Sequence, residues 1–332
     1  MTTELKTILF LHILFALLLV GGGFAFLVLL RQAQRAQSLA AARATLVGAH
    51  TVESALIVPS AVLVGLVGFL LVGRYDAKGV FEAGKAVWMH IGATLWLVLL
   101  VAGFFLGRGV RRTLALAEGS EGDGALERVK ASIRSPGVSG LTYLNVALGL
   151  VILYLMIFQP FAGEGGQALR RGVLITKELN LILLLHILFA MALLGGVAAH
   201  LLVHTRFRNE GDPTALRATM ANLRGIENAL IIGNGVMVGV MGLLLAWRYD
   251  AKGVLSFGDS RWLHVAITLW VATNVIGFLE GRSLEKAYKL GDDSGADIGS
   301  LRAVFNAPLY VALAALNVAI VLVLVYLMVF QP

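Results

Sequence analysis

The chain carries the same apolar, histidine-containing pattern twice. The segment LFLHILFALLLVGGG around His12 returns as LLLHILFAMALLGGV around His186, and RYDAKGV at 74–80 returns unchanged at 248–254. The tripeptide WMH that ends at His90 returns as the WLH that ends at His264, and all three pairs are separated by 174 residues. YLMIFQP at 154–160 returns as YLMVFQP after 172 residues. Such agreement along the whole length indicates two copies of one unit.

The apolar stretches between these motifs are long enough to cross a membrane. The mean hydropathy is +0.83, and only 14% of the residues are charged. About 20 apolar residues in a helix span the hydrocarbon core, whereas barrel strands are half as long and alternate in polarity. We therefore expect an all-α integral membrane protein with eight transmembrane helices near 7–30, 51–73, 87–107, 139–159, 180–205, 226–247, 262–281 and 308–330.

Four spans in each copy give both copies the same orientation in the membrane. The expected architecture is two parallel-repeat four-helix bundles, with the first unit at 1–160, a glycine-rich linker at 161–179 and the second unit at 180–332. The loop 113–137, which contains EGSEGDG, is predicted to be the least structured stretch. The first span is too long for a secretory signal and has no cleavage site after it, so we expect it to be retained.

The distribution of charge predicts how the chain sits in the membrane. The formal net charge is +7, which we attribute to cationic loops rather than to nucleic-acid binding. Both termini and the loops on their side hold ten of the 27 lysines and arginines, and the other side holds 17. The positive-inside rule therefore predicts a bacterial inner-membrane protein whose termini are both periplasmic. The chain has no cysteine, which excludes disulfides and thiolate ligands.

The four matched histidines are the strongest functional signal. His12 and His90 lie on the first and third spans of one unit, which run in the same direction, and both lie near the outer side. His186 and His264 repeat the arrangement. Two imidazoles that face each other across a bundle can supply both axial ligands of a b-type haem, so two haems are predicted. A copper site, or histidines that only stabilise packing, are the alternatives.

Other polar residues near the spans suggest further sites. His200 and His204 lie one turn apart near the cytoplasmic end of the fifth span, where they either form an extra metal or haem site or reach toward the interface. Glu53 and Glu227 occupy matching positions. They either deliver protons or bind quinone, or they are only carboxylates that the dipole at a helix start favours. Arg74 and Arg248 are expected beside the haem propionates. Their neighbours Asp76, Lys78, Asp250 and Lys252 offer local ion pairs.

Short motifs in the second copy resemble those of a known family. LLLHILFAMALLGG, WLHVA at 262–266, FNAPLY and the final VFQP are similar to segments of the four-span HemJ-type protoporphyrinogen oxidases. More loosely, the whole chain resembles CopD-like and uncharacterised predicted integral membrane proteins of bacteria. The resemblance implies a haem-bearing four-helix unit. The family's WLHxK lysine is replaced by Ala266 here and by Gly92 in the first copy, which argues against porphyrinogen oxidation.

Together these features predict a cytochrome b-like membrane protein. We expect it to carry electrons between a periplasmic redox partner and quinone, or to be the haem-bearing subunit of a larger respiratory or dehydrogenase complex. A CopD-like copper or small-solute transporter and a haem-free structural subunit are the alternative hypotheses. The sequence contains no soluble catalytic domain and no nucleotide-binding loop, so whether the chain is an enzyme is left open.

Overall fold

The protein is an all-α integral membrane protein. The computed structural model describes residues 2–75, 87–120, 122, 124–159, 177–249, 261–292 and 297–331, and within them it contains helices and no strands. Eight helical segments are long and apolar enough to cross a membrane. The helices are α1 (Thr3–Arg35), α2 (Leu39–Val52), α3 (Val58–Tyr75), α4 (Val87–Gly119), α5 (Ala125–Arg134), α6 (Leu141–Phe158), α8 (Lys177–Phe207), α9 (Pro213–Ile226), α10 (Ile232–Tyr249), α11 (Arg261–Asp292), α12 (Ile298–Phe305) and α13 (Pro308–Phe330).

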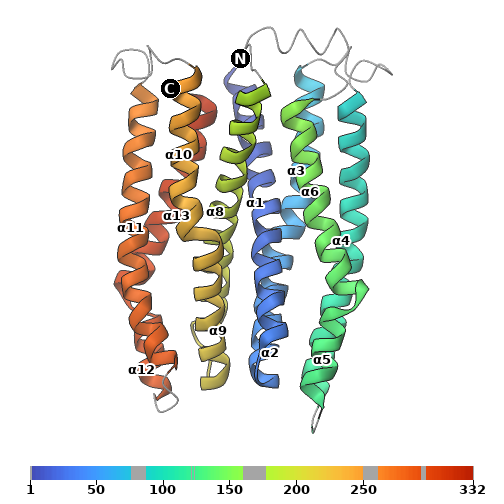
Figure 1. Cartoon of the computed structure of the whole chain (residues 1–332), viewed down its shortest axis with the longest axis vertical. Coiled ribbons are helices and arrows are strands. Elements are labelled where there is room, and N and C mark those ends of the chain that lie inside the picture. Colours follow the sequence, from blue (N-terminus) through green and yellow to red (C-terminus); the bar gives the residue numbers. More distant parts are fainter. Residues whose placement is uncertain are drawn as a thin grey trace.

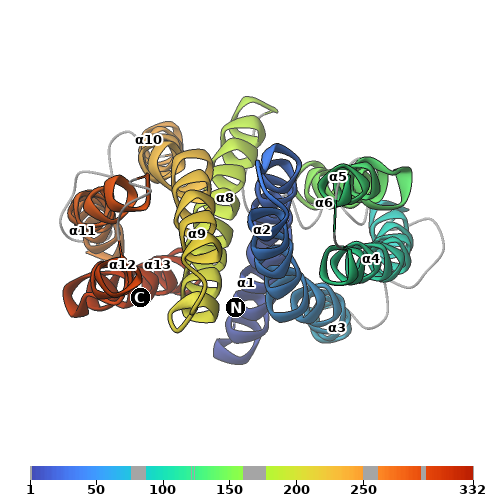
Figure 2. The same cartoon turned by 90° about the horizontal axis from the view of Figure 1, so that it is seen from below.

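The helices form two groups that stand side by side (Figures 1 and 2). We call α1–α6 the first half and α8–α13 the second half. Both chain ends lie at the same end of the molecule, here called the terminal face (Figure 1). The Lys6 ammonium there donates a 2.7 Å hydrogen bond to the Phe330 carbonyl, which ties the first helix to the last.

The helices extend well beyond the expected apolar stretches. Residues 31–50 lie between the first two expected spans, and they include the end of α1 and most of α2. The prediction that 113–137 is the least structured stretch is wrong, because α4 continues to Gly119 and α5 begins at Ala125. Most of the predicted linker, 161–176, lies outside the described residues.

The two halves meet through α1 and α8 at a pair of glycines. A methyl group on Gly21 would collide with the Met191 carbonyl, and one on Gly195 would collide with the backbone of Gly21. The two backbones therefore touch, as in the small-residue contacts by which membrane helices approach closely. Because Gly21 and Gly195 are separated by 174 residues, matching positions of the two halves face each other here.

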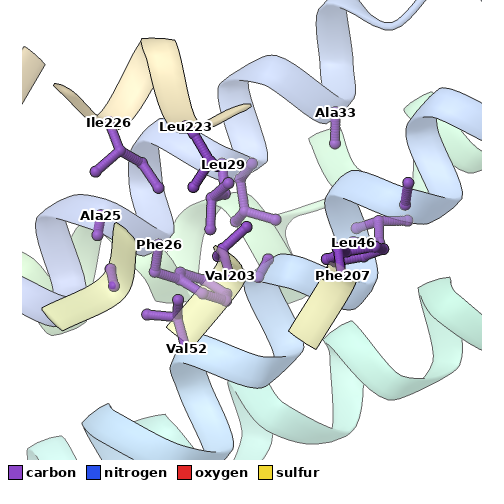
Figure 3. Packing of buried hydrophobic residues seen from close by; sticks show 14 of the residues in the cluster. Ala25, Phe26, Leu29, Ala33, Leu46, Val52, Val203, Phe207, Leu223 and Ile226 are labelled. Carbon is purple, nitrogen blue, oxygen red and sulfur yellow. The ribbon is translucent and has the colours of Figure 1, made fainter. Parts of the chain in front are cut away.

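Toward the face opposite the termini, α2 and α9 continue the contact between the halves. Thr45 and Asn222, both buried, donate hydrogen bonds to each other at 3.2 and 3.1 Å. Around them lies the largest apolar core, to which α1, α2, α8 and α9 all contribute (Figure 3). Fully buried leucine-sized side chains each contribute about 1.5–3 kcal/mol by leaving water, which favours one fixed arrangement of the halves at this end.

The second span of each half contains one turn of π-helix. The turns cover Glu53–Ile57 and Glu227–Ile231, and each begins at a glutamate. The amide of Val58 donates to the Glu53 carbonyl, and the amide of Ile232 donates to the Glu227 carbonyl. Single π turns inside α-helices are often found at functional sites. The two glutamates are therefore candidate site residues.

Candidate cofactor cavity

A large apolar cavity of about 1110 Å³ lies between the helices of both halves. Ligand pockets in proteins usually measure about 300–1,000 Å³, so this space accommodates a large ligand or two. Three of the four matched histidines line it, namely His12, His90 and His186. On α1, His12 lies nine residues from the first helical residue, which is roughly 14 Å from the terminal face.

His12 and His186 are anchored by the same hydrogen bond in each half. The Nδ1 atom of His12 lies 3.0 Å from the Val64 carbonyl, and that of His186 lies 2.9 Å from the Val238 carbonyl. A carbonyl only accepts, so Nδ1 carries the proton in both rings and Nε2 keeps its lone pair. Metal-bound histidines are oriented in this way, because the second nitrogen donates to a fixed acceptor.

On the helix that supplies each carbonyl, a glycine one turn after the valine makes room for the imidazole. A Cβ atom on Gly68 would lie 3.0 Å from Cε1 of His12, and one on Gly242 would lie 3.1 Å from Cε1 of His186. Any larger side chain would push against the ring. The second span of each half therefore fixes both the direction and the depth of its histidine.

Trp96 in the first half and Trp270 in the second make equivalent contacts between the second and third spans. The Trp96 indole donates to the Ala61 carbonyl and the Trp270 indole to the Gly235 carbonyl, both at 2.7 Å. Each ring lies so close to a glycine, Gly65 or Gly239, that a methyl group there would collide with it. Both tryptophans also line the cavity.

Replacing Trp96 with phenylalanine is expected to destabilise the protein. The variant loses a hydrogen bond, which contributes about 0.5–1.5 kcal/mol, and part of a ring that fills a fitted notch. Thermal unfolding of the detergent-purified protein measures the loss. Trp247→Phe is the matched control, because Trp247 is 60% exposed. Equal changes in Tm for the two variants would contradict the fitted role of Trp96.

The third-span histidines differ between the halves. His90 lines the cavity. His264 is not among the lining residues, although Trp262, Leu263 and Ala266 on the same turns are. The predicted pairing of His12 with His90 thus has both members at one cavity, whereas the pairing of His186 with His264 has one. Both pairings stay predictions.

The two arginines expected at haem propionates have other partners. Arg74 forms a 3.3 Å ion pair with Glu4, and the Arg248 guanidinium lies 5.5 Å from the centre of the Trp247 ring. Both lie in the last turn of their helices, and neither lines the cavity. The neighbouring Asp76, Lys78, Asp250 and Lys252 lie outside the described residues.

The other predicted site residues lie on the far side of the cavity, toward the face opposite the termini. Glu53 is buried, accepts from His50 at 3.2 Å and packs against Gly107. Glu227 accepts a 2.9 Å hydrogen bond from the Tyr288 hydroxyl. His204 bonds to the Phe305 carbonyl at 2.9 Å, and His200 lies 3.5 Å from the Tyr310 hydroxyl. In the described ranges, no three histidine, aspartate or glutamate side chains gather as a metal site.

Sequence reasoning missed several residues of these sites. The carbonyl partners of the histidines and the glycines beside them were not predicted, although their 174-residue spacing was visible. Glu280, Tyr288 and Tyr310 were also missed. Their signal was a difference between the copies, since apolar residues occupy the matching positions of the first half.

Comparisons with known proteins give no relative for this chain. No family model matches it, and neither the curated proteins nor the solved structures yield a significant match.

Proposed function

We propose that the chain is a membrane b-type haem protein that carries electrons across part of the bilayer. The single observation that supports this most is the repeated anchoring of His12 and His186. Both imidazoles hold Nδ1 on a backbone carbonyl and present Nε2 as a ligand beside a large apolar cavity. The same arrangement occurs at matching positions of both halves, 174 residues apart, and it orients each imidazole as a metal ligand requires.

The residues around the cavity fit a flat, apolar macrocycle. His12 and His186 would each supply one axial ligand, with His90 and His264 as the proposed second ligands. The glycines beside the two anchored rings and the fitted tryptophans leave flat apolar walls. A bound haem would supply a one-electron carrier with two imidazole ligands. The chain itself orients the ligands, excludes water and sets the dielectric around them.

Electron transfer fits the cavity better than porphyrinogen oxidation. The lysine of the HemJ-type motif corresponds to Gly92 and Ala266, and both of these positions line the cavity. Neither side chain can donate or accept a proton. The cavity thus offers ligands for a haem but no acid–base group at the place where the oxidases carry theirs.

The proposed setting is a bacterial inner membrane with the terminal face toward the periplasm. Seventeen of the 27 cationic residues lie on the opposite side, which fits the cytoplasm. Electrons would pass between a periplasmic redox protein and quinone, or through a larger respiratory or dehydrogenase complex. The lipid bilayer is the partner that the eight apolar helices require.

Solute transport is the second candidate function, because one cavity is lined by both halves. Transporters with internal repeats place their substrate sites between the repeats. A copper route has less support, since the described residues gather no three-ligand metal group.

The test is a dithionite-reduced minus oxidised spectrum of the full-length protein, purified in detergent after expression with added haem precursor. We expect a b-type α-band and about two haems per chain, one for each anchored histidine. Protein that folds but contains no haem would overturn the proposal. Uptake of a solute into vesicles by such haem-free protein would favour transport.

A further inference from the structure

A cluster of buried polar side chains lies in the second half, on the side of the cavity that is opposite the terminal face. One member, His200, is 14 residues from His186 on α8 and so roughly 21 Å along the helix. About 20 helical residues cross the hydrocarbon core, and counting them from Arg261 along α11 reaches Gly281. The cluster therefore lies at the boundary of the hydrocarbon on the face opposite the termini, where protons from water can reach it.

Two carboxyl groups lie together in this cluster. Glu280 is only 9% exposed, and it hydrogen-bonds with Asn317 of α13. A Cβ atom on Gly281, the next residue, would lie 3.0 Å from Oε1 of Glu227. The Glu227 carboxylate thus lies against the backbone that carries Glu280, and the two negative charges would act on each other directly.

One polar atom beside Glu280 has no donor. The side-chain oxygen of Asn317, a residue that is 3% exposed, is buried without a hydrogen-bond partner among the described residues. A buried acceptor left unpaired costs about 1–3 kcal/mol. The O–H of a protonated carboxyl group would satisfy such an acceptor, because a carboxylic acid donates where a carboxylate cannot. A proton shared by the two carboxyl groups would therefore supply the donor that this oxygen lacks.

Three members of the cluster have no polar counterpart in the first half. Leu106 and Leu114 occupy the positions of Glu280 and Tyr288, and Phe26 occupies the position of His200. The first half packs with these apolar side chains, so the fold does not require the polar ones. Buried carboxyl groups that packing does not need are costly, and in membrane proteins they mark proton or ion pathways.

The charged groups around the two carboxyl groups come from several helices. The titratable groups are His200 and His204 on α8, Arg217 and Arg224 on α9, Glu227 in the π turn, Glu280 and Tyr288 on α11, and Tyr310 on α13. The Arg224 guanidinium lies 5.5 Å from the centre of the Tyr288 ring, and the hydroxyl of that ring bonds to Glu227. Two neighbouring carboxylates repel each other, so one of them needs a proton or a metal ion. The described residues gather no three-ligand group of the kind a metal ion needs, which favours the proton.

A small surface pocket of about 230 Å³ reaches Tyr288, the hydrogen-bond partner of Glu227. Arg217, Arg224, Asn228 and Tyr288 line it. Tyr288 is thus a pocket-lining residue whose hydroxyl donates to Oε2 of Glu227. Tyrosine can pass its proton to the carboxylate while it accepts another from water, so it carries protons without a net change of charge.

We propose that Glu227 and Glu280 form a proton-exchange site that holds one shared proton and is filled from the pocket through Tyr288. Repulsion between the two carboxylates holds the proton, and the Asn317 oxygen accepts the hydrogen bond of the acid form. None of these residues lines the cavity, and the site does not depend on a bound haem.

The test is infrared spectroscopy of the full-length protein in lipid vesicles over a series of pH values. The wild type is expected to show the stretch of a protonated carboxyl group at neutral pH, which disappears as the pH rises. Glu280→Gln and Glu227→Gln should each abolish the band, because the remaining carboxyl group then has no second carboxylate beside it to disfavour its ionised form. Glu285→Gln should leave it unchanged, because Glu285 lies on the same helix but is exposed and paired with Lys289 at 2.9 Å.

A fourth variant distinguishes the proton-binding site from the route by which protons reach it. Tyr288→Phe keeps both carboxyl groups, so the band should persist while its hydrogen–deuterium exchange becomes slower. A band that survives in both glutamine variants, or no band in the wild type at any pH, would overturn the proposal. Loss of the wild-type band on adding sodium at constant pH would also overturn it, since a metal ion would then occupy the site.

Discussion

Replacing Gly21 with alanine is expected to destabilise the whole molecule, because the new methyl group has no space. It would collide with the Met191 carbonyl, so α1 and α8 must separate along the contact between the halves. Forcing extra volume into a packed site costs about 1–3 kcal/mol, and more when backbones must move. Thermal or denaturant unfolding of the purified protein in detergent measures the effect.

Gly73→Ala is the matched control and is expected to change stability in the opposite direction. Gly73 also lies in a helix, but a Cβ atom there meets nothing within 4 Å. Alanine in an open helical position is more stable than glycine by about 0.5–1 kcal/mol. If Gly21→Ala raised Tm as Gly73→Ala does, the close contact of α1 and α8 would be refuted.

His12→Ala and His186→Ala are each expected to remove about half of the haem from the purified protein, and the double variant is expected to remove nearly all of it. Each substitution deletes the imidazole whose Nδ1 is held by Val64 or Val238 and whose Nε2 is the proposed ligand. The haem-to-protein ratio and the reduced-minus-oxidised spectrum are the measurements. This prediction rests on the proposed function.

His50→Ala serves as the control for these variants. His50 bonds to Glu53 and does not line the cavity, so its loss should leave the haem content unchanged. Gly68→Val is a second check, because it keeps the ligand but presses on its ring. It should lower haem retention without removing any histidine. Full haem content in both histidine variants would overturn the assignment of the ligands.

The eight spans were predictable because twenty-residue apolar stretches leave few other structures open to a chain in lipid. The helices beyond them were not. Residues 39–50 are rich in small side chains and residues 125–134 are rich in charged ones, so neither was expected as a span, yet both form helices because their apolar faces pack against neighbouring helices. Their structure depends on tertiary contacts that no local pattern contains.

The candidate sites, like the helices, were predictable only in part. The matched histidines identified His12 and His186, but the carbonyls of Val64 and Val238 that orient them lie 52 residues away in the chain. The buried carboxyl pair could not be found from matches between the copies, because Glu280 has no polar counterpart. It became visible only when α11 and the π turn of the second span were placed side by side.

The glycine contact at the centre of the molecule has an evolutionary consequence. Since Gly21 and Gly195 are matching positions that touch each other, the two halves meet as identical subunits meet across a twofold axis. Every mutation in a homodimer appears in both subunits, so such a dimer cannot carry a costly buried acid in one subunit alone. A single chain that contains both halves is free of this constraint. It can keep one pair of features alike, such as His12 and His186, while a new trait such as Glu280 arises on one side only.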